Sequence, residues 1–466
     1  MKTRDYSRLL TELADELARR SPGSASMDRR ARAVLVDGAS HPLRSIRPFP
    51  PRIVTAHGAW VRDQDGHDVL DFWQGHLANI LGHNPSLVTS ALAHALGGGA
   101  GLETGMLDRL EVEAAEILCR QTGADLVRFS ASGSLSNMSA VMLARAFTGR
   151  ELVVKVGGGW HGTHPWALKG VAFDTPFGSG FQHVDSEGLP AAVTEAVLVT
   201  GFNDPERLRD CFRTHGDAAA CFVVEPVLGA GGFIPATREY LRVARELTHH
   251  HGALLILDEV ITGFRFRAGD LGSVYGLRPD LAVFGKVIGG GMPVSALGGR
   301  ADVMSLLGRD SGSRVNVSGG TYSAHPGSLL AARTIMEHLV ENQDQVYPRL
   351  AALGESIRAT IETAFGEEGV LARCTGHDPE VLPGSSLAMV HFPYRGDTPL
   401  SRPEQVNDPA ECDVALRRDV LDGALLCEGV HLLHGHGAAT TAHTAADVEL
   451  LGQACRKVAR RLRPHL

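Results

Sequence analysis

The fold of this 466-residue chain is decided by Leu281-Ala282-Val283-Phe284-Gly285-Lys286, a short apolar run that ends in glycine and lysine. The run predicts a buried strand, and the glycines at 285 and 289–291 mark its end. The chain has five lysines among its 45 lysines and arginines, so a lysine here departs from the usual choice of arginine. A desolvated lysine can lose its proton and attack a carbonyl group, which an arginine cannot do. The plainer interpretation is a lysine that buries its stem and keeps its ammonium group in water.

Short apolar runs alternate with helical patterns from about residue 85 onward. Such runs predict fully buried strands of a mainly parallel sheet with helices on both faces, which is an α/β fold. The runs lie at residues 197–200, 221–224, 253–257 and 281–284, and a further strand-like segment lies at 126–129.

The two ends of the chain carry different patterns. Leucines on one face predict an amphipathic helix over residues 5–20, and turn residues at 64–66 predict a hairpin over 61–72. After about residue 330, a long helix, weaker strands and a last helix at 446–461 indicate a smaller α+β domain. We therefore expect three parts: an N-terminal segment that packs with the small domain (1–60), a large α/β domain (61–330) and the small C-terminal domain (331–466).

Polar side chains stand at the ends of three predicted strands. Glu225 follows one strand, Asp258 follows the next, and Lys286 follows the third. Ligands of open α/β sheets bind in the crevice outside the carboxyl ends of the strands, so these three residues predict a site. The alternative is that each carboxylate caps the helix that follows. That alternative explains Glu225 better than Asp258, which still lies within an apolar run.

A candidate phosphate site follows the strand-like segment at 126–129. Ser132, Gly133 and Ser134 precede a helical pattern, and small residues at a helix N-terminus offer free backbone N–H groups to an anion. Serine and glycine are also ordinary N-cap residues, so the feature alone does not establish phosphate binding.

A glycine-rich turn surrounds one large aromatic residue. Glycines at 157–159 precede Trp160 and His161, and a flat ring can stack on an indole face in such a loop. A core tryptophan in a tight turn is the alternative.

Composition narrows the class of partner. The net charge is -8 and no dense run of basic residues occurs, which argues against a nucleic-acid or an anionic membrane surface. Seven scattered cysteines without a CxxC pair suggest neither disulfides nor zinc, so we expect a reduced, cytoplasmic location. The N-terminus lacks a signal-peptide pattern, and no apolar stretch is long enough to span a membrane.

Two groups of histidines need a separate interpretation. The histidines at 249–251 end a helical pattern, where they suit capping and the helix dipole. The spacing of His431, His434, His436 and His443 fits no common zinc pattern, so no metal is expected. Contact with a substrate pocket and plain structural roles both remain open for this second group.

Taken together, two motifs resemble one family. The segment 255–265, Leu-Ile-Leu-Asp-Glu-Val-Ile-Thr-Gly-Phe-Arg, and the segment 285–293, Gly-Lys-Val-Ile-Gly-Gly-Gly-Met-Pro, resemble the signature of class III aminotransferases, which depend on pyridoxal phosphate. The likeness runs from about residue 35 to the C-terminus. Further segments, among them 43–50, 80–85 and 319–326, resemble the branch of glutamate-1-semialdehyde 2,1-aminomutases and of D-phenylglycine and β-phenylalanine aminotransferases.

The resemblance implies a fold-type I architecture, pyridoxal 5'-phosphate as cofactor and a role for each matching residue. Lys286 would form the Schiff base and move the proton, and Asp258 would pair with the ring nitrogen. Arg44 would bind the substrate carboxylate. A homodimer is implied, in which Thr321 reaches the cofactor of the neighbouring subunit. The expected cofactor contacts are Ser132, Gly133, Ser134, Trp160, His161, Glu225, Asp258, Val260, Lys286 and Thr321, and the expected substrate contacts are Arg44 and Trp73.

One departure from the family pattern bears on the function. Relatives usually carry glutamate after the phosphate turn, where this chain has Leu135. The phosphate ligands survive, but a polar group near the cofactor or the dimer interface is lost, which favours a specialised substrate over a housekeeping role.

We therefore expect an aminotransferase that moves an amino group from or to a carboxylate-bearing amino acid. An aminomutase of the glutamate-1-semialdehyde type would use the same residues but retain its intermediate. A decarboxylating or racemising enzyme is a further alternative, because Trp160-His161-Gly162 with Ser136-Asn137 resembles dialkylglycine decarboxylase locally. A non-catalytic sensor on this fold is the alternative from a different class. It would need a DNA-binding module, for which the first fifty or so residues are too few and insufficiently basic.

Overall fold

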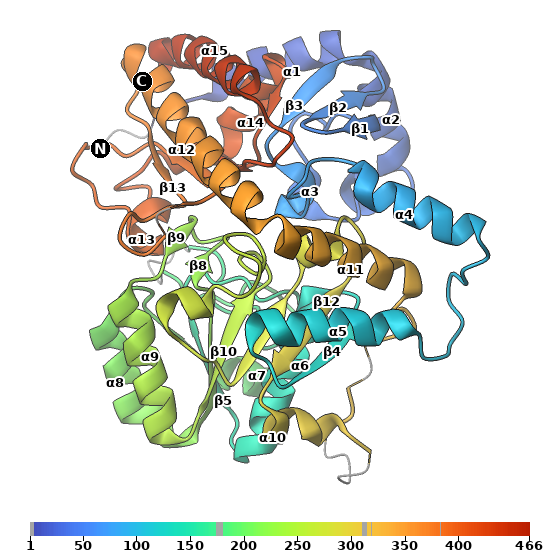
Figure 1. Ribbon diagram of the computed structural model, residues 1–466. Helices are drawn as coiled ribbons and strands as arrows, with labels where there is room; N and C mark the ends of the chain where they lie inside the picture. Colours follow the sequence, from blue (N-terminus) through green and yellow to red (C-terminus); the bar gives the residue numbers. More distant parts are fainter. Residues whose placement is uncertain (1–3, 174–179, 310–314, 318, 383) are drawn as a thin grey trace.

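The computed structural model describes residues 4–173, 180–309, 315–317, 319–382 and 384–466 (Figure 1). A large sheet with helices around it occupies the lower half of Figure 1, and the helices nearest the two chain ends lie above it. The predicted α/β architecture with a smaller α+β part is therefore confirmed.

The central sheet has seven strands among the described residues, and they are mainly parallel. Strand β12 runs antiparallel to both of its neighbours. The five strands predicted from apolar runs are confirmed, whereas β5 and β12 were not predicted. In spatial order the strands are β4 (Leu126–Ser130), β12 (Ser295–Gly299), β11 (Leu281–Phe284), β10 (Leu254–Glu259), β7 (Ala219–Val224), β5 (Leu152–Val156) and β6 (Val197–Thr200).

Helices bury both faces of this sheet, which explains the uninterrupted apolar strands. Leu255 and Leu257 of β10 pack in one core with α8 and α9, while Leu254 and Ile256 pack on the other face with α6. Helices α5 and α11 cover β4, β11 and β12 through a third core. The helices of this part are α4 (Ser86–Gly97), α5 (Arg109–Thr122), α6 (Gly133–Thr148), α8 (Pro205–His215), α9 (Arg238–His251) and α11 (Pro326–Glu341).

The N-terminal elements share a core with the C-terminal ones. Leu9, Leu13 and Leu17 of the predicted first helix pack with apolar residues of the hairpin and of the last helices. Strand β3 pairs in parallel with β15, so the predicted hairpin joins the C-terminal segment directly. The elements are α1 (Ser7–Arg20), β1 (Ile53–His57), β2 (Trp60–Asp63), β3 (Asp68–Asp71), α12 (Gln343–Glu367), β13 (Arg373–Thr375), β14 (Leu387–His391), α14 (Leu421–Cys427), β15 (Val430–His431), β16 (His436–Ala438) and α15 (Ala445–Leu462).

One long helix was predicted after about residue 330, whereas the structure has two consecutive helices there. Two helices, α11 and α12, occupy this stretch and meet at Asn342, which both ends the first and precedes the second. The domain limits at residues 60/61 and 330/331 stay predictions.

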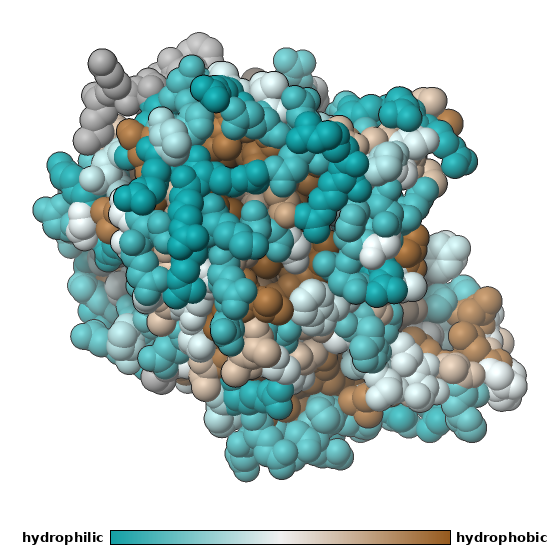
Figure 2. Space-filling view, turned by 90° about the horizontal axis from the view of Figure 1, so that it is seen from above, coloured by the Kyte–Doolittle hydropathy of each residue, from teal (hydrophilic) through white to brown (hydrophobic). Residues whose placement is uncertain are grey.

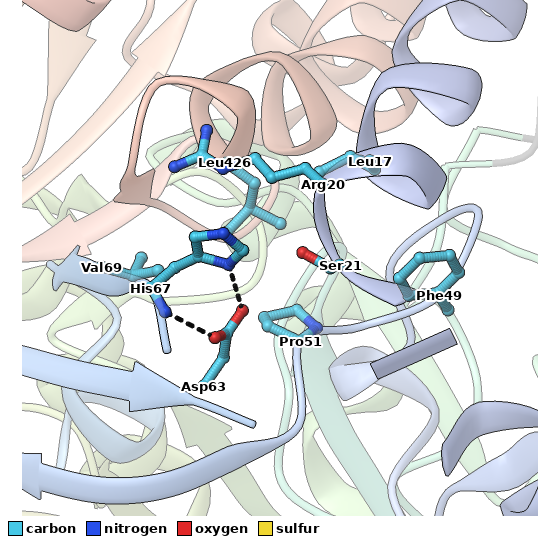
Figure 3. A pocket seen from close by; sticks show the side chains of 9 residues that line it. All are labelled: Leu17, Arg20, Ser21, Phe49, Pro51, Asp63, His67, Val69 and Leu426. Carbon is cyan, nitrogen blue, oxygen red and sulfur yellow. Dashed lines mark hydrogen bonds and ion pairs between the residues drawn. The ribbon is translucent and has the colours of Figure 1, made fainter. Parts of the chain in front are cut away.

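A small cavity lies between α1, the β2–β3 hairpin and α14 (Figure 3). Its clearest polar contact is between Asp63 and His67: the Asp63 carboxylate accepts the His67 backbone N–H at 2.8 Å and lies 3.0 Å from His67 Nδ1. None of the residues predicted for the functional site lines this cavity, so it belongs to the packing of the N-terminal elements.

Candidate active site

Three neighbouring strands bring Glu225, Asp258 and Lys286 to one edge of the sheet. Strands β7, β10 and β11 are adjacent and parallel, so their carboxyl ends meet at the same edge. Glu225 directly follows β7, Asp258 is the penultimate residue of β10, and Lys286 stands two residues after β11. The structure thus brings together the three residues that the sequence places at strand ends.

Asp258 is a buried carboxylate with three hydrogen-bond partners. Its Oδ2 atom accepts a hydrogen bond from Asn137 Nδ2 at 2.9 Å and lies 2.8 Å from His161 Nδ1. Its Oδ1 atom accepts the backbone N–H of Val260 at 3.1 Å. Asp258, Asn137 and His161 are all buried. Because a carboxylate only accepts hydrogen bonds, the ring proton of His161 belongs on Nδ1.

Glu225 is the second buried carboxylate of the site. It accepts the backbone N–H groups of Trp160 and Gly229, each at 3.0 Å. Burial, followed by the negative charge of Asp258, raises the pKa of Glu225 to about 8. A buried carboxyl group with a raised pKa is typical of sites that move protons.

Lys286 is partly buried and has a strained backbone. Its φ angle is 48°, in the left-handed region that residues other than glycine rarely adopt. Burial lowers the pKa of its amine, and the positive charge of Arg265 acts in the same direction, while Asp258 and Glu225 oppose the shift. The environment thus favours an uncharged amine beside two carboxylates.

The N-terminus of α6 faces the end of β10. Ser132 caps the helix by accepting the backbone N–H of Leu135 at 3.4 Å, and Ser134 Oγ accepts the backbone N–H of Thr163 at 3.2 Å. A Cβ atom on Gly133 would lie 2.9 Å from Val260 Cγ2, so only glycine lets Val260 pack this closely against the start of α6. The predicted phosphate residues and Val260 therefore lie together.

The glycine-rich turn after β5 holds Trp160 and His161 at the site. The backbone of Trp160 is tied to Glu225, while 38% of the residue stays exposed, so its indole is not a core side chain. His161 is instead 3% exposed and is fixed by Asp258.

His76, which the sequence analysis did not single out, lies near both Trp73 and Arg44 and also feels the charge of Lys286. The rings of Trp73 and His76 meet edge to face at 4.6 Å, and His41 contacts His76 at 4.5 Å. Burial lowers the pKa of His76 to about 3, and the charges of His41, Arg44 and Lys286 add to this shift. The guanidinium of Arg44 and the amine of Lys286 therefore both act on the same imidazole.

Thr321 lies apart from this group. It is exposed on a turn before α11, and no hydrogen bond among the described residues joins it to Asp258, Glu225 or Lys286. The turn itself passes the end of β4, because a Cβ atom on Gly319 would lie 3.0 Å from Ser130 Cβ.

The sequence analysis missed His41 and His76, and it named Asn137 only in a local resemblance, without a role beside Asp258. Asn137 carried a signal, because an amide inside an apolar helix needs a buried partner. His76 carried none that a pattern could reveal, since its position depends on four consecutive residues with positive φ angles, 74–77. In the described part of the chain, no group of three or more metal-binding side chains could hold a metal ion.

Comparison with known proteins agrees with this geometry. A family model of class-III aminotransferases matches residues 44–372. The chain is 32% identical to a glutamate-1-semialdehyde 2,1-aminomutase of Methanococcoides burtonii, over 90% of this chain and 94% of the relative. An omega-transaminase from Sphaerobacter thermophilus has a TM-score of 0.86 at 31% identity, covering 96% of this chain and 99% of that one. A β-phenylalanine aminotransferase from Variovorax paradoxus has a TM-score of 0.82 at 28% identity, with 97% of both chains covered.

The fold and the comparisons define a transferase that depends on pyridoxal 5'-phosphate. The chain belongs to the class-III aminotransferase family. The family, the enzyme class and the cofactor predicted from the sequence are therefore confirmed. The residues present also fit the cofactor, because the N-terminus of α6, which offers backbone N–H groups to an anion, packs against Val260 at the end of β10.

A glutamine at position 225 tests the raised pKa. Because the folded protein binds the Glu225 proton up to about pH 8 and the unfolded chain loses it near 4.5, the free energy of unfolding should fall as the pH rises between these values. The slope is at most about 1.4 kcal/mol per pH unit. Chemical unfolding of the cofactor-free protein between these pH values should show this slope in the wild type and a weaker one in Glu225→Gln. Glu239→Gln, an exposed residue in the first turn of α9, is the control, and equal slopes in all three proteins would contradict the assignment.

Proposed function

We propose that the protein is an aminotransferase that moves an amino group from or to a carboxylate-bearing amino acid, with Lys286 as the amine that binds the cofactor. The observation that carries this proposal is the approach of a partly buried amine of lowered pKa to the buried carboxylates Asp258 and Glu225.

The described residues suit each part of the cofactor. Pyridoxal phosphate supplies an aldehyde that condenses with amines and a protonated ring that accepts electrons. Ser132, Gly133 and Ser134 would hold the phosphate at the N-terminus of α6, and Asp258 would keep the ring nitrogen protonated. Trp160 and Val260 would lie on the two faces of the ring, with His161 behind Asp258 and Glu225 near the ring edge.

Lys286 has the properties that proton transfer requires. An amine whose pKa is lowered by burial can take a proton from a substrate carbon and would deliver it to the reacting carbon of the cofactor. Burial lowers the pKa of this amine, whereas the Asp258 carboxylate acts in the opposite direction, so the protonated amine is stabilised as it forms. The same side chain can therefore serve in both directions of the transfer.

The substrate would approach from the side of Arg44 and Trp73. Arg44 is exposed and close enough to affect His76, which also feels Lys286. A planar guanidinium binds a carboxylate through two hydrogen bonds, so Arg44 would orient the acid group of the substrate. Trp73 offers an apolar edge for the rest of the molecule.

A second candidate is an aminomutase. The curated relative from Methanococcoides burtonii carries that name at 32% identity over 90% of this chain, which supports the candidate. The solved transaminases with TM-scores of 0.86 and 0.82 support the first. Both would use Lys286 and Asp258, and they differ in whether the intermediate leaves the site.

Replacing Lys286 tests the proposed chemistry. Lys286→Ala should lower kcat by at least about 100-fold, the usual size of a lost general acid–base group. Borohydride should fix the cofactor to the wild-type chain but not to Lys286→Ala. Lys457→Ala, which removes an exposed lysine, is the control. Single amino acids, D and L, α and β, then separate the candidates: release of a keto product supports an aminotransferase, and reaction with a semialdehyde or diamine alone would support the aminomutase.

Replacing Arg44 tests the substrate carboxylate. Because a hydrogen bond to a charged group is worth about 1.5–3 kcal/mol, Arg44→Ala should raise KM for an amino acid about 10- to 100-fold. An amine without a carboxylate should be unaffected. Arg47→Ala, an exposed arginine three residues away, should behave like the wild type. An equal loss for both kinds of amine would mean that Arg44 does not bind the carboxylate.

We also propose a homodimer in which Thr321 reaches the cofactor of the partner subunit. Thr321 is exposed, and so is a set of large apolar side chains that a partner could cover: Leu102, Met106, Leu107 and Tyr322. Leu107 is 95% exposed. Figure 2 shows a mostly hydrophilic face with apolar atoms gathered on the projecting part at the lower right.

Mixed dimers test the shared site. Thr321→Val should weaken cofactor binding, whereas Lys286→Ala should remove the covalent attachment. A dimer of one subunit of each kind would contain one complete site if Thr321 acts in the partner subunit. Mixing the two variants should therefore restore wild-type cofactor affinity in up to half of the sites. Titration of each mixture measures this, and a lack of recovery in a proven mixed dimer would contradict the arrangement.

We also propose a cytoplasmic location, which the scattered cysteines support. Among the described residues no helix is both long and apolar enough to cross a bilayer.

A further inference from the structure

A small cavity adjoins the two side chains that hold Asp258. Asn137 and His161, both bonded to Asp258, line it together with His164 and Lys155. Its volume of about 10 Å³ corresponds to the space of a single water molecule. Only Asn137 and His161 thus separate the cavity from Asp258, the carboxylate proposed to contact the cofactor ring.

Several buried polar atoms beside this cavity lack a partner. Asn137 Oδ1, His161 Nε2 and both ring nitrogens of His164 are buried and make no hydrogen bond to any residue that the structure describes. Buried polar groups in folded proteins are nearly always hydrogen-bonded, to protein or to ordered water. Three neighbouring side chains with free bonding capacity therefore indicate a bound polar molecule.

Lys155 cannot satisfy these atoms. Its ammonium group donates three hydrogen bonds to backbone carbonyl groups, those of Gly159 at 3.0 Å, Ala167 at 3.0 Å and Lys169 at 2.8 Å. All three of its protons are thus directed away from His161 and His164. Burial lowers the pKa of both histidines, and the positive charge of Lys155 adds to this shift.

The bonding capacities match one water molecule. With its proton on Nδ1 toward Asp258, a neutral His161 offers an acceptor at Nε2, and Asn137 Oδ1 is a second acceptor. A neutral His164 offers one N–H donor. A water molecule that donates twice and accepts once satisfies all three side chains, which is the usual number of bonds for a buried water.

We propose that this cavity binds a water molecule that links His164 and Asn137 to His161, and that His164 is thereby a positioning residue for the Asp258–His161 pair. The water donates to His161 Nε2, so the ring proton is held on Nδ1 and directed at Asp258. The consequence for catalysis rests on the proposed role of Asp258 toward the cofactor ring, whereas the water site itself does not.

Neutron diffraction from crystals of the deuterated, cofactor-free wild type tests the site directly. We expect deuterium on His161 Nδ1, none on Nε2, and one water within hydrogen-bonding distance of His161, His164 and Asn137. A dry cavity, or deuterium on Nε2, would overturn the proposal. This measurement needs no variant and no activity, so it stands even if Lys286 proves not to bind the cofactor.

A matched pair of variants tests the positioning role. His164→Leu removes the donor to the water, and His164→Gln keeps one. Equilibrium titration measures the affinity for pyridoxal phosphate. This affinity should fall about 10-fold in His164→Leu, the usual effect of losing a residue that orients a binding side chain, and should be largely retained in His164→Gln. Equal affinities for wild type and His164→Leu would overturn the positioning role. Should His164→Leu fail to fold, the neutron map of the wild type alone decides whether the water site exists.

Discussion

The active site depends on one constraint, which is that a carboxylate buried at the end of a central strand must be fully hydrogen-bonded. An isolated buried charge is costly, and it is tolerated only when paired and hydrogen-bonded. Asp258 meets this condition with donors from three elements: Asn137 from α6, His161 from the turn after β5, and its own strand through Val260. Each of these elements therefore has its position fixed relative to the carboxylate.

The same constraint orders the rest of the site. The helix that brings Asn137 to Asp258 begins four residues earlier, at Gly133, so its N-terminus necessarily lies beside the end of β10. The turn that brings His161 also ties Trp160 to Glu225. Lys286 reaches the same edge of the sheet because it follows β11, the strand that pairs in parallel with β10. A helix N-terminus, an exposed indole and an amine thus lie around one carboxylate.

The sequence predicted what local patterns encode. Continuous apolar runs, such as 281–284, revealed the buried strands, and the residue types after them revealed Glu225, Asp258 and Lys286. Strand β12 was missed because its sequence, Ser295 to Gly299, includes two glycines, which weaken any strand pattern. The hydroxyl groups of Ser130, Ser136 and Ser295, which lie 2.7–2.8 Å apart, link β4, α6 and β12 through contacts that span up to 165 residues. No pattern within a short window can reveal such contacts.

The turn at residues 74–77, which carries His76, shows why the remaining part of the site depends on tertiary contacts. Gln74, His76 and Leu77 adopt positive φ angles, which cost about 1–2 kcal/mol for each non-glycine residue. Three buried interactions hold this turn: Asp71 accepts the backbone N–H groups of Trp73 and Gln74, at 2.9 and 3.0 Å, and Arg265 donates to the Leu77 carbonyl.

Asp71 is in turn fixed by His83 at 2.8 Å and by His431 at 2.9 Å, so a residue of the C-terminal segment helps to hold the turn. A strained conformation that is held from several directions has few alternatives. Trp73 and His76 are therefore held in place by the protein alone, and the shape of this turn depends on contacts between both ends of the chain.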